Sequence, residues 1–152
     1  MLITDYEEAL RLSGEPDIQA AIRFFQEKQV GSFVITNGSK NIYVWSSGQF
    51  LGKLNLTEMA VSAEVAQQIK YGTSGDTTGC GDNFAGGVLA SLVMQLNANI
   101  PTPDLKEACC WGIVSGGYTC FYIGGTYIEE FPGEKLEKLK PYYDCYKQKL
   151  AD

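Results

Sequence analysis

The sequence predicts an α/β fold in which helices pack on a sheet that has few strands for the number of helices. Along the chain the residue patterns indicate a helix, a strand, a hairpin, a glycine turn and then three helices. This order is typical of layered α/β architectures rather than all-β folds or helix bundles. The 152 residues, 45% of them hydrophobic, suffice for the core of one domain. We therefore expect one α/β domain with an incomplete sheet.

The first part of the pattern is a helix followed by strands. Within GEPDIQAAIRFFQEKQVG, Pro16 suits the first helical position and Gly31 supplies the end. Four apolar residues recur there at helical spacing, namely Ile18, Ala21, Ile22 and Phe25. The segment SFVITNGSKNIYVWSSGQFLGKL has β-rich runs broken at residues 37–38 and 47–48, which predicts a strand followed by a hairpin or small meander. Residues 55–74 are weakly patterned and are assigned no single type.

Three helices are predicted in the second half. The first begins near Asp82, continues to about Asn97 and packs against a sheet. Its apolar face comprises Phe84, Val88, Leu89, Leu92, Val93 and Leu96. The second helix opens with Thr102 as its cap. Its face suited to close packing comprises Leu105, Ala108, Cys109 and Gly112. The last helix runs from Glu134 to Leu150, with Leu136, Leu139, Tyr143 and Tyr146 on its inner side.

Composition disfavours several classes of function. The net charge is −6 and the twelve basic residues are scattered, so no nucleic-acid partner is expected. Acidic residues near the N-terminus argue against a secretory signal, and no stretch approaches the ~20 apolar residues of a membrane span. We therefore expect a soluble cytoplasmic protein without a membrane partner.

Cysteine and histidine content narrows the chemistry. The five cysteines, at positions 80, 109, 110, 120 and 145, lack CxxC spacing, which gives a disulfide framework or a zinc cage little support. Cys109, Cys110 and Cys120 are interpreted as small packing residues. The chain has no histidine, which excludes imidazole-based mechanisms. Acid–base chemistry would fall to carboxylates, Lys, Tyr or Cys.

The run GDTTGCGDNFAGG, residues 75–87, is the strongest candidate for a functional site. Its glycines precede a helix whose first turn has unpaired N–H groups and a positive dipole end, so the run can hold an anion without a lysine. A terminal phosphoryl group is the best candidate, with Asp82 accepting a proton from the attacking hydroxyl. Walker A and GxGxxG patterns do not fit the run. The alternative is a tight loop in which Asp82 only caps the helix.

The run resembles the C-terminal signature of the PfkB, or ribokinase-like, carbohydrate kinases, DTxGAGD followed by phenylalanine. Only Cys80 departs, because alanine is usual there; the agreeing residues are Asp76, Thr77, Gly79, Gly81, Asp82 and Phe84. Upstream, TDYEEA resembles the family's NxxE motif with Asp5 in place of asparagine and Glu8 kept. TNGSKN resembles TxGxxG, with Thr36 and Gly38 present.

The resemblance implies a role for each matching residue. Asp82 would be the catalytic base, and the N–H groups of Gly79, Cys80 and Gly81 would form an anion hole for the γ-phosphate of ATP. Glu8 would act through water on Mg²⁺, with Asp5 adding charge near that metal. Thr36 and Gly38 would line the nucleotide, with adenine between that strand end and the helix after Pro103. Asp76, the Thr78 carbonyl and carbonyls of residues 120–125 are candidates for a monovalent cation such as K⁺.

The implied fold is a ribokinase-like three-layer α/β/α sandwich, of which the chain holds the C-terminal part. Residues 1–152 would form a single ATP-binding portion with the sugar-binding lid absent. Such a fragment is expected to form a homo-oligomer or to bind a missing N-terminal half. Two functional hypotheses follow: phosphorylation of a sugar or related alcohol, with a nucleoside acceptor also open, or a non-catalytic nucleotide-binding or assembly module.

Overall fold

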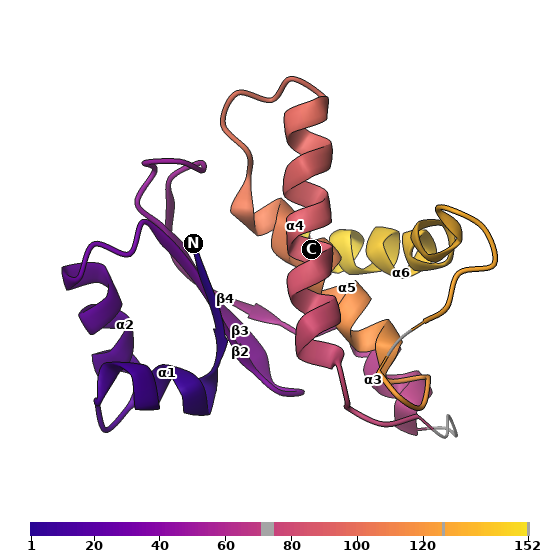
Figure 1. The fold of residues 1–152 in the computed structure, drawn as a ribbon, viewed down its shortest axis with the longest axis horizontal. Coiled ribbons are helices and arrows are strands. Elements are labelled where there is room, and N and C mark those ends of the chain that lie inside the picture. The colour runs from indigo at the N-terminus through magenta and orange to yellow at the C-terminus, as the bar shows by residue number, and fades with distance from the viewer. Residues whose placement is uncertain (71–74, 126, 152) are drawn as a thin grey trace. The chain divides into compact units, whose positions relative to one another are not determined.

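The computed structural model describes residues 1–70, 75–125 and 127–151, and the chain divides into two compact units (Figure 1). Unit 1 comprises residues 1–60 and 100–105, and unit 2 comprises residues 61–99 and 106–152. The first unit contains a sheet with two helices, and the second is built mainly from helices. Each unit is described by itself below.

Unit 1 contains a four-stranded mixed sheet with its strands in chain order: β1 (Leu2–Asp5), β2 (Ser32–Asn37), β3 (Asn41–Ser46) and β4 (Leu54–Ala60). β1 pairs with β2 in parallel, whereas β2–β3 and β3–β4 are antiparallel. The predicted strand and following meander are therefore confirmed. Residues 55–74, for which the sequence predicts no single type, contain most of β4 and all of α3 (Ala63–Lys70). Residues 71–74 of that segment lie outside the described residues.

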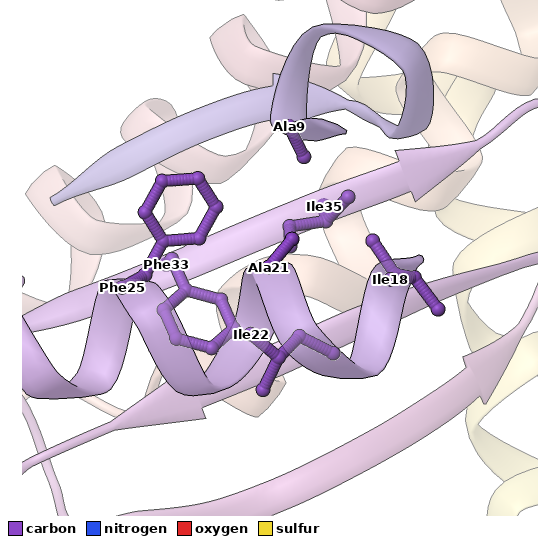
Figure 2. Close-up of a cluster of buried hydrophobic side chains, with 7 residues drawn as sticks. All are labelled: Ala9, Ile18, Ala21, Ile22, Phe25, Phe33 and Ile35. Carbon is purple, nitrogen blue, oxygen red and sulfur yellow. The ribbon is translucent and has the colours of Figure 1, made fainter. Parts of the chain in front are cut away.

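Helices α1 (Tyr6–Ser13) and α2 (Ile18–Glu27) pack on one face of this sheet (Figure 2). The shared core contains Ala9, Ile18, Ala21, Ile22, Phe25, Phe33 and Ile35. The predicted apolar face of α2 is thus confirmed, but both of its predicted ends are wrong. Asp17 is the N-cap, because its side chain accepts the N–H of Ala20 at 2.9 Å, and Pro16 lies outside the helix. The helix ends at Glu27 with Lys28 as its C-cap, before Gly31 is reached.

In unit 2, helix α4 (Cys80–Asn97) packs closely on α5 (Leu105–Thr119) through glycines. A Cβ atom on Gly87 would lie 2.9 Å from the Trp111 carbonyl oxygen, and one on Gly112 would lie 2.6 Å from a Val88 methyl carbon. The predicted bounds of α4 are confirmed within two residues. The residues that α4 buries are Phe84, Val88, Ser91 and Gln95.

Part of the predicted apolar face of α4 is wrong, because Leu89, Val93 and Leu96 are 52–56% exposed. They point away from α5, whose contact with α4 is determined by the glycine positions rather than by the largest apolar side chains. The predicted packing of α4 on a sheet involves the other unit and stays a prediction.

Helices α5 and α6 (Glu134–Ala151) complete unit 2. The small-residue face of α5 is confirmed as buried, but the helix begins at Leu105, so Thr102 is too far upstream to cap it. In α6, Leu139 and Tyr146 are buried and Tyr143 stacks on Trp111 with ring centroids 4.0 Å apart. Leu136 was predicted on the inner side, yet it is 44% exposed. No helix in the described residues is long and apolar enough to cross a membrane.

Candidate functional site

The glycine loop before α4 has a backbone conformation that requires glycine at two contacting positions. Gly79 is the N-cap of α4 and is left-handed, with φ of 71°. A Cβ atom on Gly79 would lie only 2.5 Å from the carbonyl oxygen of Gly125, which is itself left-handed. A Cβ atom on Gly125 would in turn lie 2.7 Å from the Thr78 carbonyl oxygen. The loop ahead of α4 and the loop after α5 therefore touch backbone to backbone.

The first turn of α4 has no side-chain cap, because the capping residue is glycine. The N–H of Cys80 donates to the Thr77 carbonyl at 3.3 Å, and that of Asn83 donates to Gly79 at 2.9 Å. Within the described part of the chain, no hydrogen bond is made by the N–H groups of Gly81 or Asp82. These donors and the helix dipole favour an anion at this end. Asp82 is exposed in this first turn, directly after the loop.

Asp76 connects the two loops. Its carboxylate accepts the N–H of Thr78 at 2.8 Å and that of Gly124 at 3.5 Å, while its own N–H donates to the Tyr122 carbonyl at 3.4 Å. The Thr78 N–H holds the pKa of Asp76 below its ordinary value, with a smaller contribution from Gly124. An ionised carboxylate supplies hard oxygen atoms, the ligand type that suits a cation.

Asn83 and Lys135 are two residues of this site that the sequence interpretation missed. The Asn83 amide donates to the carbonyls of Gly79 at 2.9 Å and Gly125 at 2.8 Å. Its oxygen accepts from the Lys135 ammonium at 2.5 Å. Burial lowers the pKa of Lys135. Asn83 directly follows Asp82, but no sequence spacing could connect Lys135 to a residue 52 positions upstream.

A cavity of about 460 Å³ in unit 2 begins at these residues. Its polar lining comprises Asp82, Asn83, Ser115, Glu129 and Lys135, and its apolar lining comes from α4, α5 and α6. The backbone N–H of Lys135 donates to the Glu129 carboxylate at 2.8 Å, which ties the first turn of α6 to the segment before it. Asp82 therefore lines an open pocket large enough for a small organic molecule.

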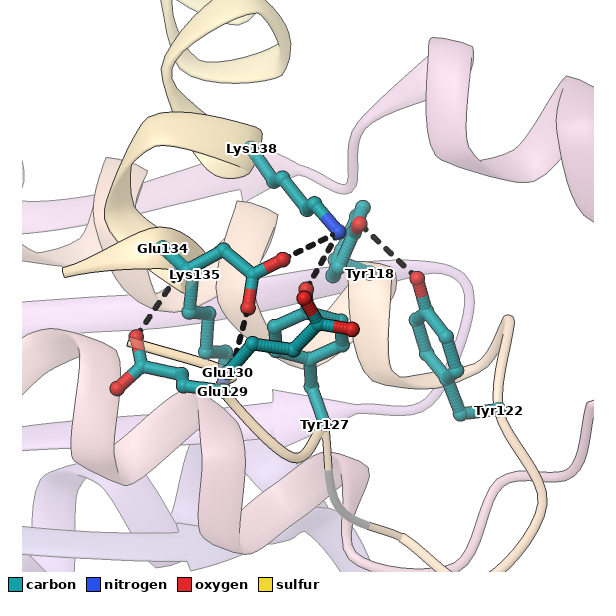
Figure 3. A network of polar contacts seen from close by, with 8 residues as sticks. All are labelled: Tyr118, Tyr122, Tyr127, Glu129, Glu130, Glu134, Lys135 and Lys138. Atoms are coloured by element: carbon teal, nitrogen blue, oxygen red, sulfur yellow. Dashed lines mark hydrogen bonds and ion pairs between the residues drawn. The ribbon is translucent and has the colours of Figure 1, made fainter. Parts of the chain in front are cut away.

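A polar network fixes the first turn of α6, which carries Lys135 (Figure 3). Glu134 accepts the Lys138 ammonium at 2.8 Å and the Glu130 N–H at 2.7 Å, and Lys138 also donates to the Tyr127 hydroxyl at 2.5 Å. The side chains of Lys138 and Tyr127 and the Glu130 N–H lower the pKa of Glu134 to about 2. These contacts hold residues 127–133, which precede α6, in place against its first turn.

Cys80 and Cys120 meet at the contact between the two loops. Their Sγ atoms are 2.9 Å apart although 40 residues separate them in the chain. Burial, followed by the neighbouring Cys120 thiol, raises the pKa of Cys80 to about 12. Cys109 and Cys110 are buried on α5, as expected for packing residues, and none of the five cysteines, all of which are described, is in a disulfide.

In unit 1, Asp5 and Glu8 form a capping box at the start of α1. The Asp5 carboxylate accepts the Glu8 N–H at 2.8 Å, and the Glu8 carboxylate accepts the Asp5 N–H at 3.2 Å and the Thr4 hydroxyl at 3.0 Å. The sequence analysis did not predict α1, although this reciprocal pattern is a known signal for a helix start.

Thr36 and Gly38 lie close to Asp5 in unit 1. β1 and β2 are parallel, and Asp5 is the register partner of Thr36, so both residues lie at the carboxyl ends of adjacent strands. Gly38 follows β2 with φ of 55°. Ligands of open α/β sheets bind beside such strand ends. Unit 1 therefore brings together the four predicted nucleotide residues, and unit 2 brings together the residues of the glycine run.

The predicted cation sites do not coincide with a cluster of metal-ligating side chains in the described residues. Among the described residues, no three Cys, Asp or Glu side chains gather into a group able to hold a metal ion. A cation at Asp76 would therefore depend on backbone carbonyls such as that of Thr78. A Mg²⁺ ion near Glu8 would depend on oxygens from water and a nucleotide. Both donor sets are hard oxygens, which fit these ions.

Comparison with solved structures places the chain in the class of ribokinase-like α/β proteins. It is similar to aminoimidazole riboside kinase from Salmonella enterica, solved with aminoimidazole riboside and an ATP analogue, with 20% identity and a TM-score of 0.61 over 93% of this chain and 41% of that one. It is also similar to a fructokinase double mutant from Vibrio cholerae O395, solved with fructose, ADP and potassium. That match has 18% identity and a TM-score of 0.59, and it covers 93% of this chain and 40% of that one.

A third similar structure is a provisional ribokinase II from E. coli, solved with ATP and Mg²⁺. The identity is 19% and the TM-score 0.62, over 95% of this chain and 39% of that one. The chain thus spans about two fifths of the length of these kinases. No curated protein matches the sequence significantly. The model of the pfkB family of carbohydrate kinases matches residues 1–131, and the chain belongs to this family.

Proposed function

We propose that the chain is the ATP-binding, catalytic portion of a kinase that phosphorylates a hydroxyl group of a sugar or related alcohol. The observation that carries this proposal is the position of Asp82, which follows a glycine loop without a side-chain cap and lines a cavity of about 460 Å³. A carboxylate beside a phosphate-binding helix end is repulsive unless it has a chemical role. Accepting a proton from the attacking hydroxyl is that role.

Asp82 would take the proton of the acceptor hydroxyl while that oxygen attacks the γ-phosphorus of ATP. Asp82 lies in the first turn of α4, directly after the glycine loop. A carboxylate suffices as the base because the transition state of phosphoryl transfer is loose and the hydroxyl loses its proton late. The N–H groups of Gly79, Cys80 and Gly81 would stabilise the charge on the transferring group.

Unit 1 would hold the rest of the nucleotide. Thr36 and Gly38 lie at the carboxyl end of β2, where they would line the phosphates and ribose. Glu8 and Asp5 would bind Mg²⁺ through water, and the metal would neutralise phosphate charge. Asp76 and the Thr78 carbonyl would hold a monovalent cation such as K⁺ beside the glycine loop. The solved kinases with ADP and potassium or with ATP and Mg²⁺ support these assignments.

A second candidate function is a non-catalytic nucleotide-binding or assembly module. It is favoured by the exposed apolar side chains of Leu89, Val93 and Leu96, which suit association with a second copy or with another chain. A nucleoside acceptor is a variant of the first function, supported by the similarity to aminoimidazole riboside kinase.

The test compares wild type with Asp82→Asn, and uses Glu137→Gln, an exposed carboxylate on α6, as the matched control. Titration calorimetry with ATP and Mg²⁺ measures binding, and ADP release is followed with a panel of sugars and nucleosides. We expect binding in all three proteins and turnover in wild type and the control only. Binding without turnover in wild type would favour the second function. Turnover retained in Asp82→Asn would refute the role of Asp82.

A further inference from the structure

The glycine loop before α4 contacts the loop after α5 through a pair of cysteine thiols that phosphoryl transfer does not use. Cys80 is the first residue of α4, and Cys120 directly follows the last residue of α5. Their Sγ atoms are 2.9 Å apart, closer than packing alone requires, and both side chains are partly exposed. The other cysteines have different surroundings: Cys109 and Cys110 are buried within α5, and Cys145 lies on α6.

We propose that Cys80 and Cys120 are a modification site, at which a reversible disulfide joins the glycine loop to the loop after α5. A disulfide has an S–S distance of about 2.05 Å, so the two sulfur atoms need to approach by only about 0.9 Å. Partial exposure gives a small oxidant access to the pair.

The oxidant we name is a small-molecule disulfide such as glutathione disulfide. One protein thiolate attacks it, so that a mixed disulfide forms and one reduced small thiol leaves. The second protein thiolate then attacks the protein sulfur of the mixed disulfide, which releases a second small thiol. The two protein thiols lose two electrons and two protons, and the oxidant gains both as two thiols. The reverse exchange with an excess of small thiol restores the reduced pair.

The disulfide would act on the nucleotide site, and this part of the inference rests on the proposed function. The N–H of Cys80 belongs to the proposed anion hole. The backbone around it is too closely packed for the loop to move toward Cys120 without a change in its conformation. A Cβ atom on Gly79 would already lie 2.5 Å from Gly125, and one on Gly75 would overlap the Cys120 carbonyl. Bond formation would therefore displace the N–H groups of the loop. We expect ATP affinity to fall about tenfold or more, because the loss of one hydrogen bond to a charged group weakens binding by about that factor.

The first experiment maps the bond in the full chain. The protein is incubated overnight with excess glutathione disulfide, unfolded in the presence of iodoacetamide and digested without reductant. Trypsin releases Cys80 in a peptide of residues 71–106 and the cysteines of α5 with Cys120 in a peptide of residues 107–135. Chymotrypsin cleavage after Trp111 or Tyr118 then separates Cys120 from Cys109 and Cys110.

We expect a cross-linked Cys80–Cys120 peptide, with the other three cysteines alkylated. The link should disappear in Cys80→Ala and in Cys120→Ala and persist in Cys145→Ala. Alkylation of both Cys80 and Cys120 in wild type, stable mixed disulfides alone, or pairing with another cysteine would overturn the proposal. Mapping in the wild-type protein decides this point even if a variant does not fold.

ATP titration of the reduced and oxidised protein tests the consequence separately. Weaker binding after oxidation, reversed by dithiothreitol, supports redox control of the site, and Cys80→Ala should bind ATP equally under both conditions. Equal affinity of the two wild-type forms would refute that control while the bond itself stands. A mapped disulfide in a protein that binds no ATP in either form would instead contradict the proposed function.

Discussion

Two adjacent glycines of α4 allow the packing of α4 on α5 to be measured with a matched pair of variants. A Cβ atom on Gly87 would lie 2.9 Å from the Ser115 Cβ, 2.9 Å from the Trp111 carbonyl oxygen and 3.0 Å from the Gly112 Cα. A Cβ atom on Gly86 would meet nothing within 4 Å. Both residues lie inside the same helix with ordinary backbone angles, so alanine brings the same gain in helix propensity at each.

The magnitudes follow from these distances. Replacing glycine by alanine within a helix stabilises by about 0.5–1 kcal/mol, and Gly86→Ala should show this gain in full. Gly87→Ala has the same gain in helix propensity, but its methyl group would clash with the Trp111 carbonyl oxygen and the Gly112 Cα, which no side-chain rotation can move away. Overpacking of this kind costs about 1–3 kcal/mol. We therefore expect Gly87→Ala to be less stable than Gly86→Ala by about 1–3 kcal/mol.

Urea unfolding followed by far-UV circular dichroism measures this difference, provided that both variants keep the slope of the wild-type transition. Tryptophan fluorescence, to which Trp45 in unit 1 and Trp111 in unit 2 contribute, gives a second probe of the same transition. Coincident curves from the two probes are needed before free energies are compared. If the two variants are stabilised equally, the close approach of α4 and α5 is wrong.

Two further predictions concern the ends of helices α1 and α6. Asp5→Ala should lower the free energy of unfolding by about 0.5–2 kcal/mol because α1 loses its cap. Asp5→Asn should leave the free energy of unfolding nearly unchanged because asparagine caps equally well. Equal losses in the two variants would contradict the capping role. Glu134 has a folded pKa of about 2, below its ordinary value near 4.3, so its contribution to stability is present above that value and is lost as pH falls towards 2. Unfolding free energies measured from pH 5 to pH 2 should therefore decline less steeply in Glu134→Gln than in wild type or Glu137→Gln, and parallel declines would contradict the network around Glu134.

Local signals predicted those elements whose ends are specified by neighbouring residues. The start of α4 was predicted within two residues because a glycine run precedes a long apolar segment. The β2–β3 hairpin was predicted because an Asn-Gly pair separates two β-rich runs. The motif residues of the glycine run lie together because they are contiguous in the chain, and their roles stay predictions. For such features, short-range sequence information is sufficient.

Features that depend on distant residues could not be predicted in the same way. Helix α4 is apolar over most of its circumference, so hydrophobic periodicity could not show that Ser91 is buried while Leu89 is exposed. Its buried face is determined by Gly87 and by Gly112 of the neighbouring helix, which allow close approach. Lys135 and Cys120 reach the glycine loop only through tertiary packing, from 52 and 40 residues away. No spacing rule connects them to that loop.

The capping box at α1 explains how Asp5 can stand where the NxxE motif that this segment resembles has asparagine. Both residues cap a helix equally well, so Asp5 keeps the helix start that orients Glu8. The box uses only Oε2 of Glu8, and Oε1 makes no hydrogen bond within the described residues. Thr36 lies across from Asp5 at the neighbouring strand end. The capping box therefore fixes the Glu8 carboxylate at the strand ends of unit 1. Because Oε1 is left for the proposed Mg²⁺ shell, Glu8 can cap the helix and bind the metal through water at the same time.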